Sequence, residues 1–137
     1  MILVDTGPLI ALFEPKDSQH VRCRAALREM HEPLTTTVPV LAEAFYMLGP
    51  GSRGSNNLRD FLMRGAMGVW FMDSFAIERA FELMEVYADH PMDLADASLI
   101  VAAEVLSTLS VFTIDRNDFA TYRIRRGHRY FAPEVVG

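Results

Sequence analysis

Two aspartates follow short apolar runs, where the ends of buried strands would bring them together. Asp5 follows Ile2–Val4, and Asp115 follows Ser110–Thr113. A short apolar run bounded by turn residues is typical of a strand buried on both faces. In one parallel sheet, both aspartates would emerge at the same edge, where ligands of such sheets bind. The alternative for Asp5 is local, because Asp-Thr-Gly-Pro can form an Asx turn or cap the next helix.

Two further acids lie on segments that can reach the same edge. Asp96 lies in the first turn of the apolar segment Leu94–Leu106, and a buried carboxylate needs a partner. Glu43 lies in the early turns of Val38–Leu48, which follows a β-prone run. Taken alone, Glu43 would be an ordinary exposed helix acid. Together, four separate segments can each deliver one carboxylate to one end of a sheet.

Such a cluster of carboxylates needs a compensating charge, because like charges a few ångströms apart raise each other's pKa. No basic residue stands beside Asp5, Glu43 or Asp96 in the sequence. A hard divalent cation is the natural partner, and ligands that are all oxygen suit Mg²⁺ or Mn²⁺. An ion of this kind can activate water and stabilise the displacement at a phosphodiester.

Other polar residues near these acids have two interpretations each. Asp93 has the spacing of an N-cap, which we favour, with a supporting role at the site as the alternative. Asp118 either caps a short turn or reaches the metal. Thr6, Thr113 and Ser98 would orient the carboxylates as outer-shell hydroxyls, or bond the local backbone alone.

The net charge of −5 argues by itself against a nucleic-acid binder, but the basic residues are unevenly distributed. They concentrate between residues 116 and 129, where Asp118 is the only acid. Arginine suits phosphates and stacks on bases, so this segment is a candidate RNA contact. The alternative is a solubilising surface. The candidate residues are Arg116, Arg123, Arg125 and Arg126.

Aromatic and histidine side chains provide fewer candidates for function than the acids and arginines do. Tyr122 and Tyr130 are candidates for stacking on bases, whereas core packing is the expected role of Phe119. The four histidines are scattered, and none pairs with a nucleophile, so we interpret them as surface residues. The four are His20, His31, His90 and His128.

The order of apolar and turn segments predicts an α/β fold in one domain of 137 residues. Expected strands are Ile2–Val4, Leu34–Thr37, Val69–Met72, Ser110–Thr113 and Tyr130–Phe131. Expected helices are 18–31 with Ser18 as cap, 38–48, 57–65, 74–88 with Ser74 as cap, and 94–106. The apolar positions of helix 18–31 include Val21, Ala25 and Leu27. The expected inner face of helix 74–88 consists of Phe75, Ala76, Ala80, Leu83, Met84 and Tyr87. Residues 50–54 are expected to form a loop.

Several protein classes are disfavoured by composition. The single Cys23 excludes an internal disulfide, and no cysteine–histidine cluster suggests zinc. The apolar stretch Leu94–Phe112 is long enough to resemble a membrane span, but it contains Asp96 and Glu104. We expect a buried helix followed by a strand, and a cytoplasmic protein with no membrane segment.

These residues, in this order, resemble those of a PIN domain, and more narrowly those of the toxin ribonucleases of VapBC-type toxin–antitoxin pairs. The resemblance covers essentially the whole chain and rests on four acids in their expected local contexts. The segments are Ile2-Leu-Val-Asp-Thr6, Pro39-Val-Leu-Ala-Glu43, Met92-Asp-Leu-Ala-Asp-Ala-Ser98 and Phe112-Thr-Ile-Asp-Arg-Asn-Asp-Phe119.

The resemblance implies a single PIN-like domain over residues 1–137, built as a three-layer α/β/α sandwich with a central parallel sheet of about five strands. It implies an endoribonuclease that hydrolyses RNA phosphodiester bonds with Mg²⁺ or Mn²⁺. The implied catalytic acids are Asp5, Glu43, Asp96 and Asp115, and the implied metal ligands are Asp5, Asp96, Asp115 and Asp118. Thr6, Asp93 and Thr113 would support them.

The resemblance also implies partners. Homodimers are usual in the family, as is inhibition by a cognate VapB-like antitoxin whose tail occupies the groove near the acids. An apolar patch for such a dimer could come from a short segment of this chain. Its candidate residues are Phe61, Met63, Met67 and Trp70.

Three other functions compete with this one. Asp5-Thr6-Gly7 is also the signature of an aspartic protease, but that fold is almost all β, against the long helical segments here. A phosphatase-like fold with Asp5 as nucleophile typically needs a second Asp where Gly7 stands. A non-catalytic or RNA-processing PIN domain, acting mainly as an RNA- or protein-binding module, is the alternative that keeps the same fold.

Overall fold

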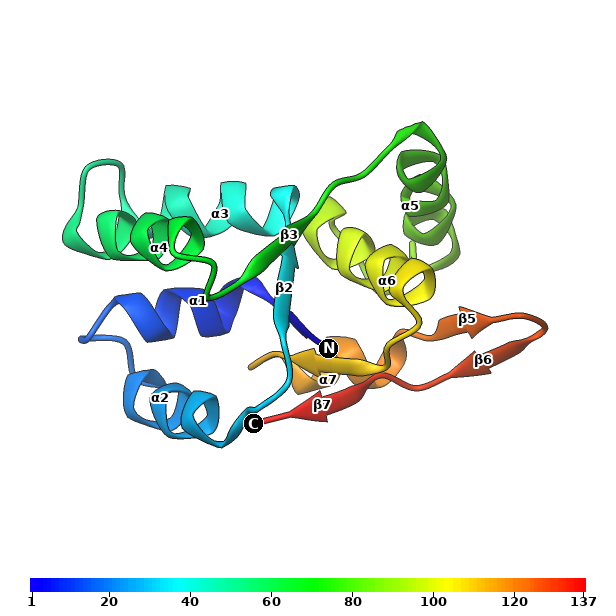
Figure 1. Ribbon diagram of the computed structural model, residues 1–137. Helices are drawn as coiled ribbons and strands as arrows, with labels where there is room; N and C mark the ends of the chain where they lie inside the picture. The colour runs from blue at the N-terminus through cyan, green and yellow to red at the C-terminus, as the bar shows by residue number, and fades with distance from the viewer.

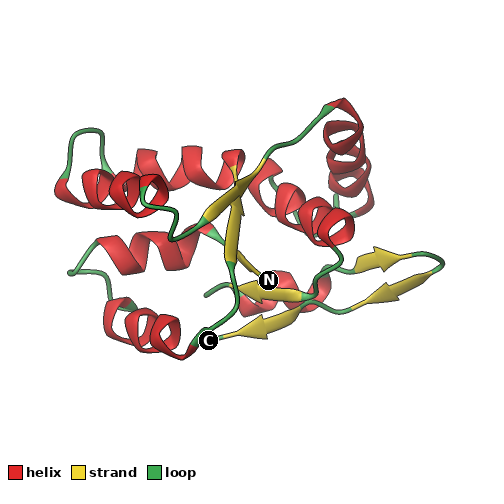
Figure 2. Ribbon diagram, in the orientation of Figure 1, coloured by secondary structure: helices red, strands yellow, loops and turns green.

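The computed structural model describes all residues, 1–137, as seven helices and seven strands (Figures 1 and 2). The strands are β1 (Ile2–Val4), β2 (Leu34–Thr37), β3 (Gly68–Trp70), β4 (Ser110–Phe112), β5 (Ile124–Arg126), β6 (Arg129–Phe131) and β7 (Glu134–Val136). The helices are α1 (Thr6–Phe13), α2 (His20–Glu29), α3 (Val38–Leu48), α4 (Arg53–Met63), α5 (Ser74–Val86), α6 (Leu94–Leu106) and α7 (Arg116–Thr121).

Five parallel strands form the central sheet, in the order β3-β2-β1-β4-β7. Helices flank the sheet, which confirms the predicted α/β/α sandwich. From β1 the chain moves outward through β2 and β3, and then returns to place β4 and β7 on the other side of β1. The direction of strand order therefore reverses between β1 and β4. In open parallel sheets, ligands bind beyond the carboxyl ends of the strands at this point.

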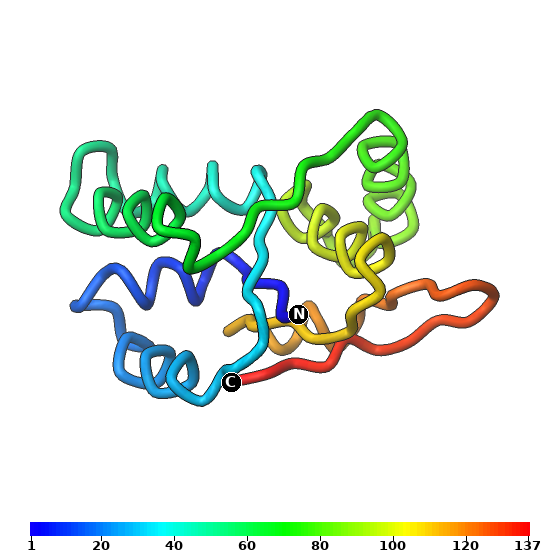
Figure 3. The backbone as a smooth tube through the Cα atoms, in the orientation of Figure 1, coloured from blue at the N-terminus to red at the C-terminus, as the bar shows by residue number.

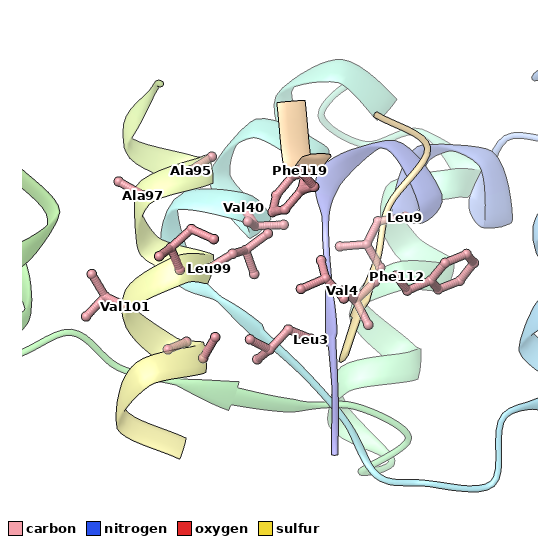
Figure 4. Close-up of a cluster of buried hydrophobic side chains, with 14 of the residues drawn as sticks. Leu3, Val4, Leu9, Val40, Ala95, Ala97, Leu99, Val101, Phe112 and Phe119 are labelled. Carbon is pink, nitrogen blue, oxygen red and sulfur yellow. The ribbon is translucent and has the colours of Figure 1, made fainter. Parts of the chain in front are cut away.

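The core forms where α6 packs against the sheet. Figure 4 shows side chains of α6, including Leu99, facing those of β1 and neighbouring segments. Leu3, Leu99 and Val40 are completely buried, and Phe112 is 2% exposed. Because β1 is covered on both faces, it consists of continuous apolar residues rather than alternating ones. No helix has the length and apolar character needed to cross a membrane.

Caps set the helix starts, and two predicted caps were wrong. The cap of α5 is Asp73, whose Oδ1 accepts a hydrogen bond from the Ala76 N–H (2.9 Å), so Ser74 is already helical. α2 begins at His20 after Gln19, which makes no capping hydrogen bond, and Ser18 lies outside the helix.

Two helix faces also differ from the sequence prediction. Val21, Ala25 and Phe75 are exposed, and the buried residue of α2 is Cys23. Helix α2 is predominantly polar, so its few apolar positions did not define the face that packs. In α5 the other predicted inner residues are buried or half-buried, and only Phe75 turns outward.

Helix α4 begins at Arg53, earlier than the predicted start at residue 57. Ser52 caps it, its Oγ accepting from the Ser55 N–H (3.0 Å). Gly54, taken as a loop glycine, lies inside the helix, where a Cβ would stand 2.7 Å from the Phe13 carbonyl oxygen. The glycine therefore permits a close approach between α4 and the end of α1.

The last strand of the sheet is β7, not the predicted Tyr130–Phe131. That segment belongs to β6, which pairs antiparallel with β5 in a separate two-stranded hairpin. The hairpin projects away from the sheet, as the tube in Figure 3 shows in orange and red. Sequence patterns missed β7 because it has only three residues, Glu134–Val136, and lies close to the end of the chain.

Candidate metal centre

Seven carboxylates line one pocket of about 600 Å³ at the carboxyl edge of the sheet, beside the ends of β1 and β4. We call it the acidic pocket. All four predicted catalytic acids line it, as do Asp118 and Asp93, and no Lys, Arg or His does. The seven acids are Asp5, Asp17, Glu43, Asp93, Asp96, Asp115 and Asp118.

Asp5 is fixed by the strand that precedes it and by its neighbour β4. Its N–H donates to the Phe112 carbonyl (2.9 Å), which continues the pairing of β1 with β4. Its Oδ1 accepts from the Thr6 N–H and its Oδ2 from Thr113 Oγ1, both at 2.8 Å. Asp5 therefore both caps α1 and faces the pocket, so the two interpretations of this residue are compatible. Thr113 does orient a carboxylate.

Asp96 depends on a side chain from a distant segment. It lies in the first turn of α6, where Asp93 Oδ1 accepts from its N–H (2.8 Å), so Asp93 is the N-cap. The Asp96 Oδ2 accepts a hydrogen bond from Tyr122 Oη at 3.0 Å. The Tyr122 side chain is completely buried, so it cannot stack on bases as the sequence suggested.

Asp115 and Asp118 form a connected pair on α7. Asp115 caps the helix, its Oδ1 accepting from the Asp118 N–H (3.1 Å). The carboxyls also share a hydrogen bond, which raises the pKa of Asp115 and lowers that of Asp118. His90 Nε2 contacts Asp118 Oδ1 and lowers the pKa of Asp118 further. His90 is therefore in contact with an acid of the site, although its side chain remains partly exposed.

The remaining predicted polar residues divide into two groups. Glu43 and Thr6 line the pocket, and the buried Oγ1 of Thr6 has no hydrogen-bond partner. Ser98 is elsewhere: its Oγ bonds Thr37 Oγ1 (2.6 Å) and the Ala95 carbonyl (2.7 Å), fastening α6 to the end of β2. Asp17, from the segment before α2, completes the rim and was not predicted.

Burial without an internal cation raises the pKa of two carboxyls. Desolvation, partly offset by the hydrogen bonds from Thr113 and Thr6, raises the pKa of Asp5 to about 6. Desolvation, with the charges of Asp93 and Asp5, raises the pKa of Asp96 to about 7. Burial and the Asp96 charge raise the pKa of Tyr122, which keeps its proton as a donor.

The donor set fits a hard divalent cation. All ligand candidates are oxygens, the pocket contains no competing cation, and Thr6 Oγ1 is a buried polar atom without a partner. In the present side-chain positions, no three acidic, histidine or cysteine side chains converge closely enough to hold an ion. The pocket thus gathers the acids around a shared space, and closing on an ion requires side-chain rotation.

The predicted RNA-contacting arginines lie outside the acidic pocket. Arg125 is on β5, and its N–H donates to Glu104 Oε2 (2.9 Å). Glu104 follows Asp96 on α6 by about 12 Å of helix axis. Arg123 Nη1 donates to the carbonyls of residues 120, 121 and 122, so that side chain helps close α7. Arg116 and Arg126 are exposed.

The proposed apolar patch is not supported as a unit. Phe61 is 8% and Met67 3% exposed, so both belong to the core, whereas Met63 is 80% exposed and Trp70 is half-buried. Three exposed phenylalanines lie instead on and near α5. They are Phe71, Phe81 and Phe75, the last of which was predicted to face inward.

The fold and the pocket define a class of α/β proteins, in which an acidic pocket suited to a cation lies at the switch point of a parallel sheet. The model of the PIN domain family matches residues 2–124. The chain belongs to the PIN domain family, as the resemblance implied.

Individual relatives are similar over nearly the whole chain. Ribonuclease VapC26 of Mycobacterium tuberculosis is 26% identical over 132 residues, covering 94% of this chain and 97% of the relative. The crystal structure of M. tuberculosis VapC20, described as a toxin that cleaves the sarcin–ricin loop, superimposes with a TM-score of 0.79 at 17% identity, covering 89% and 96% of the two chains. A toxin–antitoxin complex from Klebsiella pneumoniae gives a TM-score of 0.69 at 20% identity, covering 88% and 92%.

Proposed function

We propose that this protein is a metal-dependent endoribonuclease and the toxin of a type II toxin–antitoxin pair. The observation that carries the proposal is the acidic pocket at the sheet switch point of a PIN domain, with buried carboxylates and no internal cation. The similarity to Ribonuclease VapC26 supports RNA as substrate. The donor chemistry supports Mg²⁺ or Mn²⁺ as the cofactor.

Each acid of the pocket would have its own role at the metal site. Asp5, Asp96 and Asp115 would hold the ion, and Glu43 would assist from α3. Asp118, held by His90, would support the outer edge of the site. Thr113 keeps the Asp5 carboxylate oriented. When bound, the ion lowers the pKa of water and offsets the charge that develops on the phosphodiester.

RNA would be held by a surface other than the acidic pocket, because seven carboxylates repel phosphate. We infer that the hairpin of residues 123–131, here called the arginine hairpin, supplies part of that surface. Arg126 stands directly opposite Arg129 in the β5–β6 register, and neither forms an ion pair within the chain. Like charges directly opposite one another are unfavourable, so an anionic partner would stabilise this pair.

The other partners are proposed by similarity. The Klebsiella pneumoniae neighbour is a toxin–antitoxin complex, which supports a VapB-like antitoxin as the inhibitor of this chain. A homodimer and a cytoplasmic location complete the proposal, as expected for a toxin that acts on RNA. The single PIN-like domain would carry all of these contacts.

The test is RNA cleavage by the purified protein with Mn²⁺, with Mg²⁺ and with chelator, on structured and unstructured RNAs. The Asp96→Asn variant removes one ligand charge and keeps the side-chain shape. The exposed Asp60→Asn variant on α4 is the matched control. We expect cleavage that needs metal, disappears in Asp96→Asn and persists in Asp60→Asn.

The alternative function predicts a different outcome. If the folded protein binds RNA or an antitoxin but cleaves no RNA under any of these conditions, it acts as a binding module. Metal-independent cleavage that survives Asp96→Asn would contradict the proposed site directly.

A further inference from the structure

Tyr122 is the largest completely buried side chain of the protein, and its one polar atom contacts the acidic pocket. It lies between α7 and β5, and its hydroxyl donates to Asp96 Oδ2 at 3.0 Å. No other group donates a hydrogen bond to the Asp96 carboxylate. A buried tyrosine hydroxyl needs a partner, and here that partner is an acid of the candidate metal site.

Two other acids of the site are oriented by main-chain donors. Asp5 accepts from the Thr6 N–H, as well as from Thr113 just after β4, and Asp115 accepts from the Asp118 N–H. Asp96 differs, because no main-chain N–H donates to its carboxylate, and its donor is a single buried tyrosine hydroxyl.

Aromatic rings hold Tyr122 in place on three sides. Tyr87, Phe119 and His90 contact its ring edge-to-face, with ring centroids 5.2, 5.3 and 5.9 Å away. The Tyr87 hydroxyl accepts a hydrogen bond from the Arg123 N–H (2.9 Å), which fixes the backbone just after Tyr122. The hydroxyl of Tyr122 is thus presented to Asp96 by a rigid support.

We propose that Tyr122 is a positioning residue for metal binding, which orients the Asp96 carboxylate through its hydroxyl. The inference rests on the proposed metal site and adds a residue that no pattern of acids reveals. Outer-shell partners of metal ligands typically contribute ten- to a hundredfold to metal affinity. Removing the hydroxyl while keeping the ring should therefore weaken the site without disturbing the packing.

The experiment compares Tyr122 with Tyr46, an exposed tyrosine on α3 outside the acidic pocket. Mn²⁺ binding is measured without RNA, by the loss of the free-ion electron paramagnetic resonance signal, for wild type, Tyr122→Phe and Tyr46→Phe. We expect the dissociation constant to rise about tenfold in Tyr122→Phe and to stay unchanged in Tyr46→Phe. Circular dichroism and thermal unfolding in chelator establish that both variants are folded at the temperature of the titration.

An Asp5→Asn sample separates failure of this inference from failure of the proposed site. If Asp5→Asn loses Mn²⁺ binding but Tyr122→Phe binds as wild type does, the tyrosine has no positioning role. Equal weakening in Tyr122→Phe and Tyr46→Phe would show that the loss does not depend on the contact with Asp96, and it would overturn the proposal as well. If Asp5→Asn binds Mn²⁺ as wild type does, the metal site itself is wrong.

Discussion

Two regions of this molecule hold buried carboxylates, and they differ in the source of the compensating charge. In the acidic pocket, Asp5 is 7% exposed and faces other acids. At the far end of α6, the Glu104 side chain is 10% exposed and pairs with Arg79, whose Nε and Nη2 donate to its two oxygens at 2.9 and 3.1 Å. The Arg125 N–H adds a third donor.

The comparison distinguishes acids that stabilise the fold from acids that are free to bind a ligand. Glu104 and Arg79, with the Arg125 N–H, form what we call the Glu104 clamp, which fastens α5 and the arginine hairpin to α6. Its charges are balanced inside the chain, so nothing further is required. The acidic pocket is balanced only by protonation or by an added cation. A buried carboxylate without a cationic partner inside the chain therefore indicates a binding site.

The largest expected effect is loss of catalysis on changing Asp5. Asp5→Asn should lower RNA cleavage about a thousandfold, because a bound ion supplies several kcal/mol of transition-state stabilisation. Glu104→Gln, the matched amide change at the other end of α6, should cleave within about threefold of wild type while it remains folded. Single-turnover rates with Mn²⁺ would measure both. Equal losses in the two variants would remove the distinction between the regions.

Stability should respond in the opposite way. Glu104→Gln leaves the half-buried Arg79 with only the exposed Glu82 as a charge partner, and breaking a buried pair costs about 3 kcal/mol. Glu82, whose side chain is 63% exposed, also pairs with Arg79 at 3.1 Å and is the matched control. Glu82→Gln should change the free energy of unfolding by less than about 1 kcal/mol.

Urea unfolding in chelator would measure the two clamp variants. Similar free energies of unfolding for Glu104→Gln and Glu82→Gln would show that burial of the Glu104–Arg79 pair does not add to stability. A loss confined to Glu104→Gln would confirm that the buried pair of the clamp stabilises the fold.

The pH dependence of stability gives a third test. The pKa of Asp5 in the folded chain is about 6, above the ordinary 3.8, so between these values the folded state holds a proton that the unfolded chain has released. The free energy of unfolding of the metal-free protein should therefore fall as pH rises through this window. The change in pKa corresponds to at most about 3 kcal/mol, fully expressed above pH 6.

Asp5→Asn removes the cost of burying an ionised carboxylate at this position. In chelator, the variant should be more stable than wild type by about 2 kcal/mol at pH 8, and the difference should vanish near pH 4. Urea midpoints across the range would measure it. A wild type that gains stability as pH rises through 4–6, relative to the variant, would have the wrong sign and contradict the burial argument.

The sequence predicted the parts of the site that are local in the chain. Asp5 and Asp115 could be placed because each comes shortly after a buried strand, and the parallel pairing of β1 with β4 brings both strand ends to the same edge of the sheet. Helices α3 and α6 were predicted with the bounds observed, because their apolar character and their Pro or Asp starts are local signals.

The parts that were missed depend on long-range packing. The contact of Tyr122 with Asp96 and that of His90 with Asp118 join residues more than 20 positions apart. β7 was missed because its pairing with β4, not its own composition, makes it a strand. Gly54 looked like a loop residue because the reason for it, the Phe13 carbonyl, lies on another helix.

The smallest expected effect concerns the arginines of the hairpin that form no ion pair within the chain. Arg126→Gln should weaken RNA binding about fivefold and reduce the slope of log affinity against log salt by about one, as for one lost phosphate contact. Arg59→Gln on α4, at the opposite end of the molecule in Figure 1, removes the same charge as a control. Fluorescence anisotropy in chelator, over a range of salt concentrations, prevents cleavage and measures both. The two variants lose the same net charge. A salt slope that falls only in Arg126→Gln would therefore assign the phosphate contact to the arginine hairpin. Equal slopes would indicate that the hairpin arginines serve only to keep the surface soluble.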